Sequence, residues 1–351
     1  MTRLFTAVAA SLAAISMATG CAQRGTQAQQ IRNISVDTST DGWETVAKRA
    51  RIKKTIHLSD SVLLGNISKL LCHNGNIYLL DKSSRSILCY NGEGELQFRI
   101  CTVGRGPGEY TGISNFYLSG RKNRLYIIAP EKKILEYSAS TGELLSSRPI
   151  DAKTIMFTDG AQLEGGETAL GIVGPQYNLA ICAADTIKYH IPFNMARDFS
   201  FMEKAFAQQG SQVLFIHGMS NNIYSVEPDS AYVKYVVDFK GYEIPDKDYL
   251  EKSPAEIQKI HNSRTVATRV DNLTDSPQYL SFSYWLMHPN KEQETRYVLF
   301  NKRTGESVNI HNGNLFPIRD VCGELFVSLM GNTGETAPDN GENPVVVMWK
   351  L

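Results

Sequence analysis

The hydrophobic pattern of residues 77–112 is repeated, with variation, along most of the chain. Two apolar runs at 77–80 and 87–90 are followed by a glycine-containing polar turn at 91–95 and a third run at 96–101. Short apolar runs separated by turn residues are typical of β-strands joined in a meander. This segment is therefore predicted to form three antiparallel strands.

The same order of two strands, a polar turn and a third strand recurs along the chain. Apart from one longer interval, the units begin roughly 40 to 50 residues apart, a period typical of propeller blades. Runs such as 77–80 and 125–128 are apolar on both faces, as expected for strands packed between neighbouring sheets. We therefore predict an all-β fold, a six-bladed β-propeller. Its six units are residues 76–100, 124–150, 167–193, 212–239, 278–310 and 323–351.

The two ends of the propeller sequence indicate how the ring closes. The sixth unit ends at its third strand, residues 345–351, and has no further strand of its own. Residues 52–58 form a strand-like run with no partner near it in the sequence. We predict that this N-terminal strand lies beside residues 345–351 and closes the ring as the outer strand of the last blade.

Residues 240–278 interrupt the repeat. Ser253, Pro254 and Glu256 form an N-cap, a first-turn proline and a capping box, which together predict a helical insertion at about 253–267. The helix is expected to run from Pro254 towards Ala267. Two interpretations are open: a surface helix between two blades, or a lid or partner-binding element.

The first twenty residues have the features of an export signal. Arg3 precedes an apolar stretch at 4–17 that is too short to span a bilayer, and small residues lead to Cys21. This ending resembles the lipobox of bacterial lipoproteins, which implies lipidation of Cys21 and anchoring through lipid only. An ordinary secretory signal is the alternative. The predicted domains are a signal peptide at 1–20, a tether and N-terminal extension at 21–50, and the propeller at 51–351 with its insertion at 240–278.

Charge and cysteine content exclude several classes of protein. The 36 basic and 36 acidic residues balance, so the sequence does not indicate a nucleic-acid partner. Apart from Cys21 there are five cysteines, with no Cys-x-x-Cys pair, which argues against a zinc knuckle or a complete disulfide framework. Free thiols are expected.

The glycine-rich segment GRGPGEY at 104–110 is the candidate ligand-binding loop. Its glycines and Arg105 could accept an anion, with Glu109 and Tyr110 beside it. It is not a P-loop, because no Gly-Lys-Ser/Thr follows. The structural interpretation is that the loop carries the chain between two blades, with Arg105 and Glu109 joining them.

Three features together resemble a known family. The lipoprotein signal, the segment at 104–110 and the terminal NPVVVMWKL at 343–351 are similar to the six-bladed β-propeller lipoproteins of Bacteroides-type bacteria, themselves distantly similar to NHL-repeat and TolB-like propellers. The resemblance implies an outer-membrane lipoprotein. Because no acidic residues follow Cys21 directly, we expect it to face the periplasm rather than the cell surface.

Two functions remain open at this point. The favoured one is a monomeric, non-catalytic binding or scaffolding module for a protein, peptide or glycan of the cell envelope, without a cofactor. No catalytic or metal-binding residue can be named, since the seven histidines are scattered and no Gly-x-Ser-x-Gly occurs. The alternative is a hydrolase or lyase holding a divalent metal at the mouth of the central channel. Carboxylate, Asn or His side chains converging at one mouth would favour this alternative.

Overall fold

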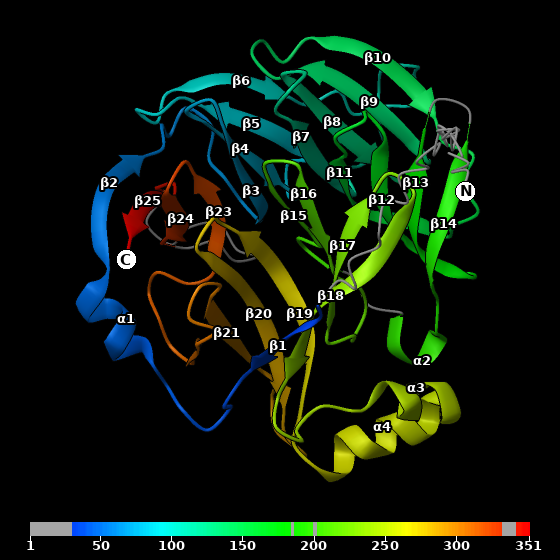
Figure 1. The fold of residues 1–351 in the computed structure, drawn as a ribbon. Coiled ribbons are helices and arrows are strands. Elements are labelled where there is room, and N and C mark those ends of the chain that lie inside the picture. Colours follow the sequence, from blue (N-terminus) through cyan, green and yellow to red (C-terminus); the bar gives the residue numbers. More distant parts are fainter. Residues whose placement is uncertain (1–29, 184–185, 199–201, 332–341) are drawn as a thin grey trace, which may run out of the picture. The chain divides into compact units, whose positions relative to one another are not determined.

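Six β-sheets surround a central channel in the computed structural model, which confirms the predicted six-bladed β-propeller (Figure 1). The structure describes residues 30–183, 186–198, 202–331 and 342–351. From Ile31 onward the chain forms one compact unit.

Each of the first five blades is built from consecutive strands, with the first strand of each blade at the channel (Figure 1). Blade 1 holds β3 (Ile67–His73), β4 (Asn76–Asp81), β5 (Ser86–Tyr90) and β6 (Leu96–Ile100). Blade 2 holds β7 (Asn115–Ser119), β8 (Arg124–Ala129), β9 (Lys133–Ser138) and β10 (Leu144–Pro149). Blade 3 holds β11 (Met156–Gln162), β12 (Thr168–Val173), β13 (Tyr177–Cys182) and β14 (Ile187–Pro192).

The remaining blades follow the same plan, except that a short helix precedes blade 4 and an N-terminal strand completes blade 6. Blade 4 holds β15 (Phe206–Gln209), β16 (Gln212–Phe215), β17 (Asn222–Glu227) and β18 (Ser230–Asp238), and the short helix α2 (Met195–Asp198) precedes it. Blade 5 holds β19 (Val266–Asp275), β20 (Tyr279–Met287), β21 (Glu294–Asn301) and β22 (Ser307–Ile310). Blade 6 holds β23 (Ile318–Cys322), β24 (Leu325–Met330), β25 (Val345–Lys350) and the N-terminal β2 (Arg51–His57).

The pairing of β2 with β25 confirms the predicted closure of the ring. The two strands are antiparallel, with Ile56 opposite Val346 and Thr55 opposite Val347. On β25, the fully buried Trp349 packs on Phe326 of the neighbouring β24, with ring centroids 4.9 Å apart. The last blade is thus completed by chain from both ends of the propeller sequence.

The innermost strand of each blade is the element that the sequence pattern did not predict. Four of these six strands, β3, β11, β19 and β23, contain register shifts where a bulge interrupts the pairing. Bulges disturb the two-residue period on which strand prediction relies. Polar side chains such as Lys69 and Asp159 also occupy buried positions that the pattern would fill with apolar residues.

The residues before β2 are built onto the rim of the propeller. Strand β1 (Arg32–Ser35) adds a fifth strand to blade 4 by parallel pairing with β18, and α1 (Trp43–Arg49) follows it. Between them, Asn309 Nδ2 of blade 5 donates to the carbonyl of Thr40 at 2.6 Å. We call residues 31–50 the N-terminal strap. Sequence analysis had assigned them only to an extension.

The insertion before blade 5 holds two helices, α3 (Asp246–Glu251) and α4 (Pro254–Ser263). The predicted capping box is present: Ser253 Oγ accepts from the backbone N–H of Glu256, and the Glu256 carboxylate accepts from that of Ser253. The helix ends at Ser263, not near Ala267 as predicted. Val266 and Ala267 are instead buried at the start of β19, where pairing with β20 replaces helical hydrogen bonds.

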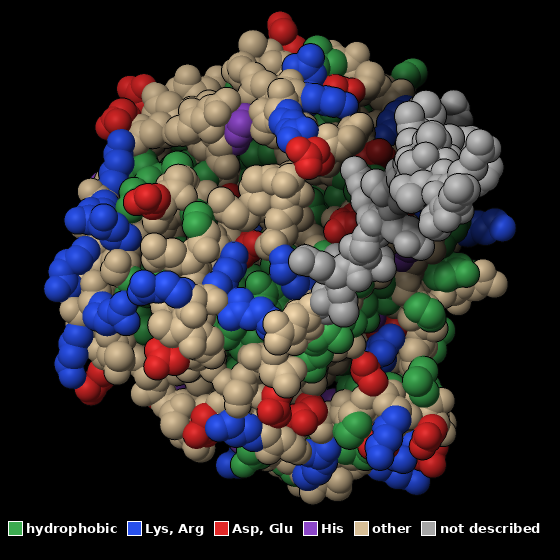
Figure 2. Space-filling model, viewed as in Figure 1, with side chains coloured by type: hydrophobic (Ala, Val, Ile, Leu, Met, Phe, Trp, Pro, Cys, Tyr) green, Lys and Arg blue, Asp and Glu red, His purple; other side chains and the backbone are tan. Residues whose placement is uncertain are grey.

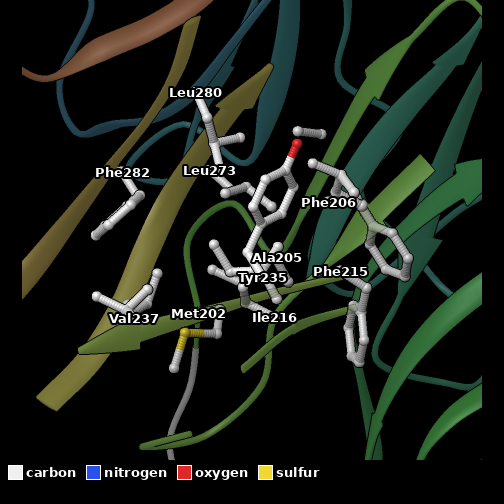
Figure 3. Close-up of a cluster of buried hydrophobic side chains, with 14 of the residues drawn as sticks. Met202, Ala205, Phe206, Phe215, Ile216, Tyr235, Val237, Leu273, Leu280 and Phe282 are labelled. Carbon is white, nitrogen blue, oxygen red and sulfur yellow. The ribbon is translucent and has the colours of Figure 1, made fainter. Parts of the chain in front are cut away.

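Apolar side chains fill the spaces between blades. Figure 3 shows part of the largest cluster, in which Tyr235 and Val237 from blade 4 lie near Leu280 and Phe282 from blade 5. Burial of such surfaces contributes roughly 25 cal/mol per Å² and holds neighbouring sheets face to face. Among the described helices, none is long and apolar enough to cross a membrane.

Candidate functional site in the propeller channel

A network of polar side chains, all buried except the partly exposed Asp320, crosses the middle of the channel. Each blade supplies one member from its innermost strand or from the segment leading into it. We call this set the channel network; its members are Lys69, Asn115, Asp159, Lys204, Asp271 and Asp320.

The first half of the channel network links blades 1 to 4. Lys69 Nζ lies 2.6 Å from Asp159 Oδ1 and also donates to the carbonyl of Phe116 at 2.9 Å. The second oxygen of Asp159 accepts from the backbone N–H groups of Ala205 and Phe206. Burial lowers the pKa of Lys69, and the Asp159 carboxylate opposes that shift.

The second half of the network returns to blade 1. Lys204 Nζ lies 3.1 Å from Asp320 Oδ1 and also donates to Thr274 and to the carbonyl of Arg319. Asp320 Oδ2 accepts from the backbone N–H of Cys72 at 2.8 Å. The network therefore runs around the whole ring. Members of the network line two pockets, which we call the two mouths of the channel.

The first mouth, which we call mouth A, is a pocket of about 570 Å³ at the ends of β3, β7, β11 and β15. Lys69, Lys204 and Asp320 of the channel network line it, together with His73, Tyr117 and Gln162. Burial lowers the pKa of His73. The imidazole is therefore neutral at physiological pH.

The second mouth, mouth B, is a pocket of about 620 Å³ formed by blades 4, 5 and 6. Polar groups in its lining come from all three blades: Glu203 precedes β15, Asp271 and Asn272 lie on β19, and Arg319 lies on β23. These residues are far apart in the sequence. The propeller topology alone brings them together.

Strand β19 has an unusual backbone where it lines mouth B. Arg269 and Asn272 have φ values of +54° and +52°, in the left-handed region that non-glycine residues seldom adopt. The pairing of β19 with β20 shifts register on both sides of Asp271. A left-handed residue costs of order 1–3 kcal/mol, and such strain tends to cluster at functional sites. Both strained residues line mouth B, which makes this mouth the better candidate site.

The carboxyl group of Asp271 is the most perturbed acid in mouth B. Burial raises its pKa to about 6, against the lowering effect of Arg269, 3.5 Å away. Its oxygens also accept from the backbone N–H groups of Glu203, Lys204 and Asn272. Asp271 thus joins blade 5 to blade 4 in the way that Asp159 joins blade 3 to blade 4.

Aromatic rings and guanidinium groups form the walls of mouth B. The Arg269 guanidinium lies over the Trp285 ring, 3.8 Å from its centroid, in a cation–π arrangement. Tyr297 packs against Phe316 with centroids 5.7 Å apart. Arg319 lies 3.6 Å from the Glu203 carboxylate, and its buried Nε has no hydrogen-bond partner among the described residues. The two basic and two acidic groups balance, so the site has no net charge.

The charges of the wider surface are not evenly mixed. Figure 2 shows Lys and Arg side chains gathered along the left side of the visible face, where Figure 1 places α1 and β2, and mixed with Asp and Glu elsewhere. The chain as a whole has equal numbers of basic and acidic residues.

The loop predicted to bind a ligand lies between blades 1 and 2, away from both mouths. Tyr110 is fully buried, and its hydroxyl donates to the carbonyls of Arg85 and Ile100. The exposed Glu109 accepts from the backbone N–H of Gly106 within the same loop. Arg105 is exposed and joins no ion pair among the described residues. Ligand binding by Arg105, Glu109 and Tyr110 stays a prediction.

Other predicted sites have different outcomes. Cys21 and the signal segment lie outside the described residues. The five described cysteines are free thiols: Cys72, Cys89, Cys101, Cys182 and Cys322. Within the described ranges, no group of three or more His, Cys, Asp or Glu residues could hold a metal ion.

A second buried charge cluster lies next to α2, outside the channel. Asp198 accepts from Arg197 Nε at 2.7 Å, faces His217 Nδ1 at 3.0 Å and accepts from Asn178 Nδ2 at 2.8 Å. Burial acts to raise the pKa of Asp198, but the contacts with His217 and Arg197 outweigh it and hold that pKa well below the usual range. These contacts fasten α2 to blades 3 and 4.

Fold and channel together define a six-bladed β-propeller with polar side chains across its channel. The chain belongs to the family described as domain of unknown function DUF4934, whose sequence model matches residues 58–330. It is structurally similar to a putative exported protein from Bacteroides fragilis, with a TM-score of 0.69 and 17% identity over 92% of this chain and 99% of that one. A member of the DUF4221 family from Bacteroides vulgatus aligns with a TM-score of 0.54 and 12% identity, over 86% and 97% of the two chains. None of the curated proteins compared with the chain matches its sequence. The predicted resemblance to Bacteroides-type propellers is thereby confirmed.

Proposed function

We propose that the protein is a lipid-anchored, monomeric binding module of the cell envelope that holds a glycan in mouth B. The observation that carries the proposal is the lining of this pocket. Aromatic rings lie beside amide, hydroxyl and paired charged groups, and one of the lining strands, β19, has a strained backbone at two of the lining residues.

The chemistry of the lining favours a sugar over a charged ligand. Sugar rings present apolar C–H faces that pack on aromatic rings, and such surfaces are offered by Tyr297 and by the part of Trp285 that Arg269 does not cover. Sugar hydroxyls both donate and accept hydrogen bonds, which suits Asn272, Asn314 and the charged pairs in the lining. Because Arg269 and Arg319 are offset by Asp271 and Glu203, a strongly anionic ligand gains little.

Binding can be tested with an array of envelope glycans, followed by calorimetry on the glycans that bind. Trp285→Ala should lower affinity at least tenfold, and Tyr297→Phe should lower it less, since it removes only a hydroxyl. Tyr189→Phe is the matched control, because this tyrosine lines a separate pocket next to Tyr177 on blade 3. Binding that Trp285→Ala leaves unchanged would place the site elsewhere. If peptides bind and glycans do not, the proposal of a glycan ligand is wrong.

The enzymatic alternative has one observation in its favour. Two carboxylates, Glu203 and Asp271, share mouth B, and Asp271 has a pKa of about 6, within the range of a general acid. Against it, each carboxylate is paired with an arginine. The bound glycans should therefore be recovered intact after incubation. Cleavage that stops in Asp271→Asn would establish the enzyme, and metal analysis with and without EDTA would show whether it needs a divalent ion.

The cellular address proposed here is the outer membrane, with the propeller facing the periplasm. A lipid on Cys21 would hold the chain at its N-terminus. Mass analysis of the N-terminal peptide and fractionation of cells producing Cys21→Ser test this: the variant should lose the acyl chains and leave the membrane fraction. A protein that lacks acyl chains, or is exposed to surface labelling, contradicts the proposal.

A further inference from the structure

Two cysteines meet where the first blade adjoins the last. Cys72 lies on β3, the innermost strand of blade 1, and Cys322 lies on β23, the innermost strand of blade 6. Their thiols lie close enough for each to shift the pKa of the other. Both side chains are half-buried and pack against the same apolar cluster, which joins these two blades.

The backbone holds the two strands in the orientation that this contact needs. Asp320 Oδ2 accepts from the backbone N–H of Cys72 at 2.8 Å, which ties β23 to β3. Because side chains two residues apart in a strand point to the same side, Cys322 faces β3 as Asp320 does. The contact is therefore a property of the interface between the blades and not of a mobile loop.

We propose that Cys72 and Cys322 form a disulfide that joins blade 1 to blade 6 when the protein meets an oxidising thiol–disulfide environment. This inference does not depend on a glycan ligand. An exported chain encounters compartments where disulfides persist, which is where such a bond would form.

The reaction balances as a thiol–disulfide exchange with an oxidant that carries a disulfide. The Cys322 thiolate attacks one sulfur of the oxidant, forms a mixed disulfide and releases the first oxidant thiol. The Cys72 sulfur, after losing its proton to solvent, attacks the Cys322 sulfur and releases the second oxidant thiol. Two protein thiols are oxidised, and the oxidant disulfide is reduced to two thiols.

The surroundings of the pair suit this order of attack. Contact with the Cys72 thiol lowers the pKa of Cys322 to about 7, so a large share of Cys322 is thiolate at neutral pH. The same contact, with burial, raises the pKa of Cys72. Cys322 is itself partly exposed, and Cys72 lines mouth A, so an oxidant can reach the pair from solvent.

The test uses the full chain carrying Cys21→Ser, purified reduced and then treated with oxidised glutathione. The number of free thiols should fall by two, and peptide mapping without reduction should recover one cross-linked species containing Cys72 and Cys322. The thermal midpoint of the oxidised protein should exceed that of the reduced protein by roughly 5 °C or more, since the bond closes a very long loop.

Matched variants separate this pair from the other thiols. Cys101→Ser removes an exposed thiol elsewhere and should still form the cross-link. Cys322→Ser should form no disulfide within the protein, so its thiols are lost only where glutathione attaches to them. Its thermal midpoint should not rise on oxidation. Since the peptide map is made on the chain with both cysteines, it stands even if a variant folds poorly. Retention of all thiols after oxidation, or a cross-link through Cys101, would overturn the proposal.

Discussion

Lys69 of blade 1 forms its ion pair with Asp159 of blade 3, with Nζ and Oδ1 2.6 Å apart and both side chains almost fully buried. Lys69 reaches past blade 2, where it also donates to the carbonyl of Phe116. A pair between non-adjacent blades is possible only at the centre of the ring, where all six innermost strands converge. The contact therefore links the positions of three blades.

The two partners of this pair should differ in their importance for stability. Without Lys69, Asp159 still accepts three backbone hydrogen bonds, from Gly160, Ala205 and Phe206. Without Asp159, Lys69 keeps only one carbonyl partner among the described residues. Asp159→Ala should cost about 3–5 kcal/mol of unfolding free energy, the range for an unpaired buried charge, and Lys69→Met clearly less.

Urea denaturation of both single variants and the double variant measures this difference. The double variant should be more stable than the sum of the single effects, because it leaves no unpaired lysine. Equal losses for the two single variants, or simple additivity, would show that the ion pair does not act as described.

Ring closure by β2 and β25 should be required for cooperative folding. Removal of residues 345–351 deprives blade 6 of a central strand and leaves β2 without a partner. We expect circular dichroism and calorimetry to show no sharp unfolding transition. Removal of residues 1–36 is the matched truncation: it deletes the edge strand β1 and should lower the thermal midpoint while leaving a cooperative transition. A sharp, unchanged melt after the C-terminal deletion would refute this role.

Asp271 should make the protein less stable as the pH rises from about 4 to 6. Its folded-state pKa, about 6, lies above its ordinary value of 3.8, so the folded state binds the proton more tightly than the unfolded state. The unfolding free energy therefore falls as the carboxyl group ionises. Relative to Asp271→Asn, wild type should lose about 2–3 kcal/mol over this range. Urea denaturation of both proteins at several pH values gives the difference, and parallel profiles would argue against the shifted pKa.

Asp198 should act in the opposite direction at lower pH. Its folded-state pKa is depressed, so its contribution is fully present above the ordinary aspartate pKa and is lost as the pH falls further. Asp198→Asn should be less stable at pH 7 by about 3–5 kcal/mol, because Arg197 stays buried with less compensation. The variant should also lose less stability than wild type on acidification.

The control for Asp198 is an aspartate at the surface. Asp229→Asn removes an exposed ion pair with Lys188 and should leave stability nearly unchanged at pH 7. If the two variants behave alike in denaturation experiments, the buried cluster next to α2 is not the source of the acid sensitivity.

The strands and the closure of the ring were predictable because short runs of apolar residues in the sequence indicate them directly. Residues 77–80 and 87–90 read as strands and lie within β4 and β5, and the strand-like run at 52–58 overlaps β2. The capping box located α4 to the residue at its start, since Ser253 and Glu256 act through short-range geometry. The predicted end of α4 was wrong because Val266 and Ala267 pair with β20, and the local sequence does not show such a tertiary interaction.

The candidate site was not predictable, for a related reason. Glu203, Arg269 and Arg319 belong to three blades, and each by itself reads as an ordinary surface charge. The one local signal is the polar DNLTD at 271–275 within an apolar strand, but bulges there hide the strand period. Only an arrangement of blades in space reveals that these side chains share a pocket.

The N-terminal strap also has a mechanical consequence. Its first strand meets the propeller at the edge of blade 4 through four residue pairs with β18, and the chain then passes along blade 5 before entering blade 6. A pull on the N-terminal end would load those four pairs in turn before it reached the strand that closes the ring. Under such a load, the contacts of the strap would therefore break before the pairing of β2 with β25 that closes the ring.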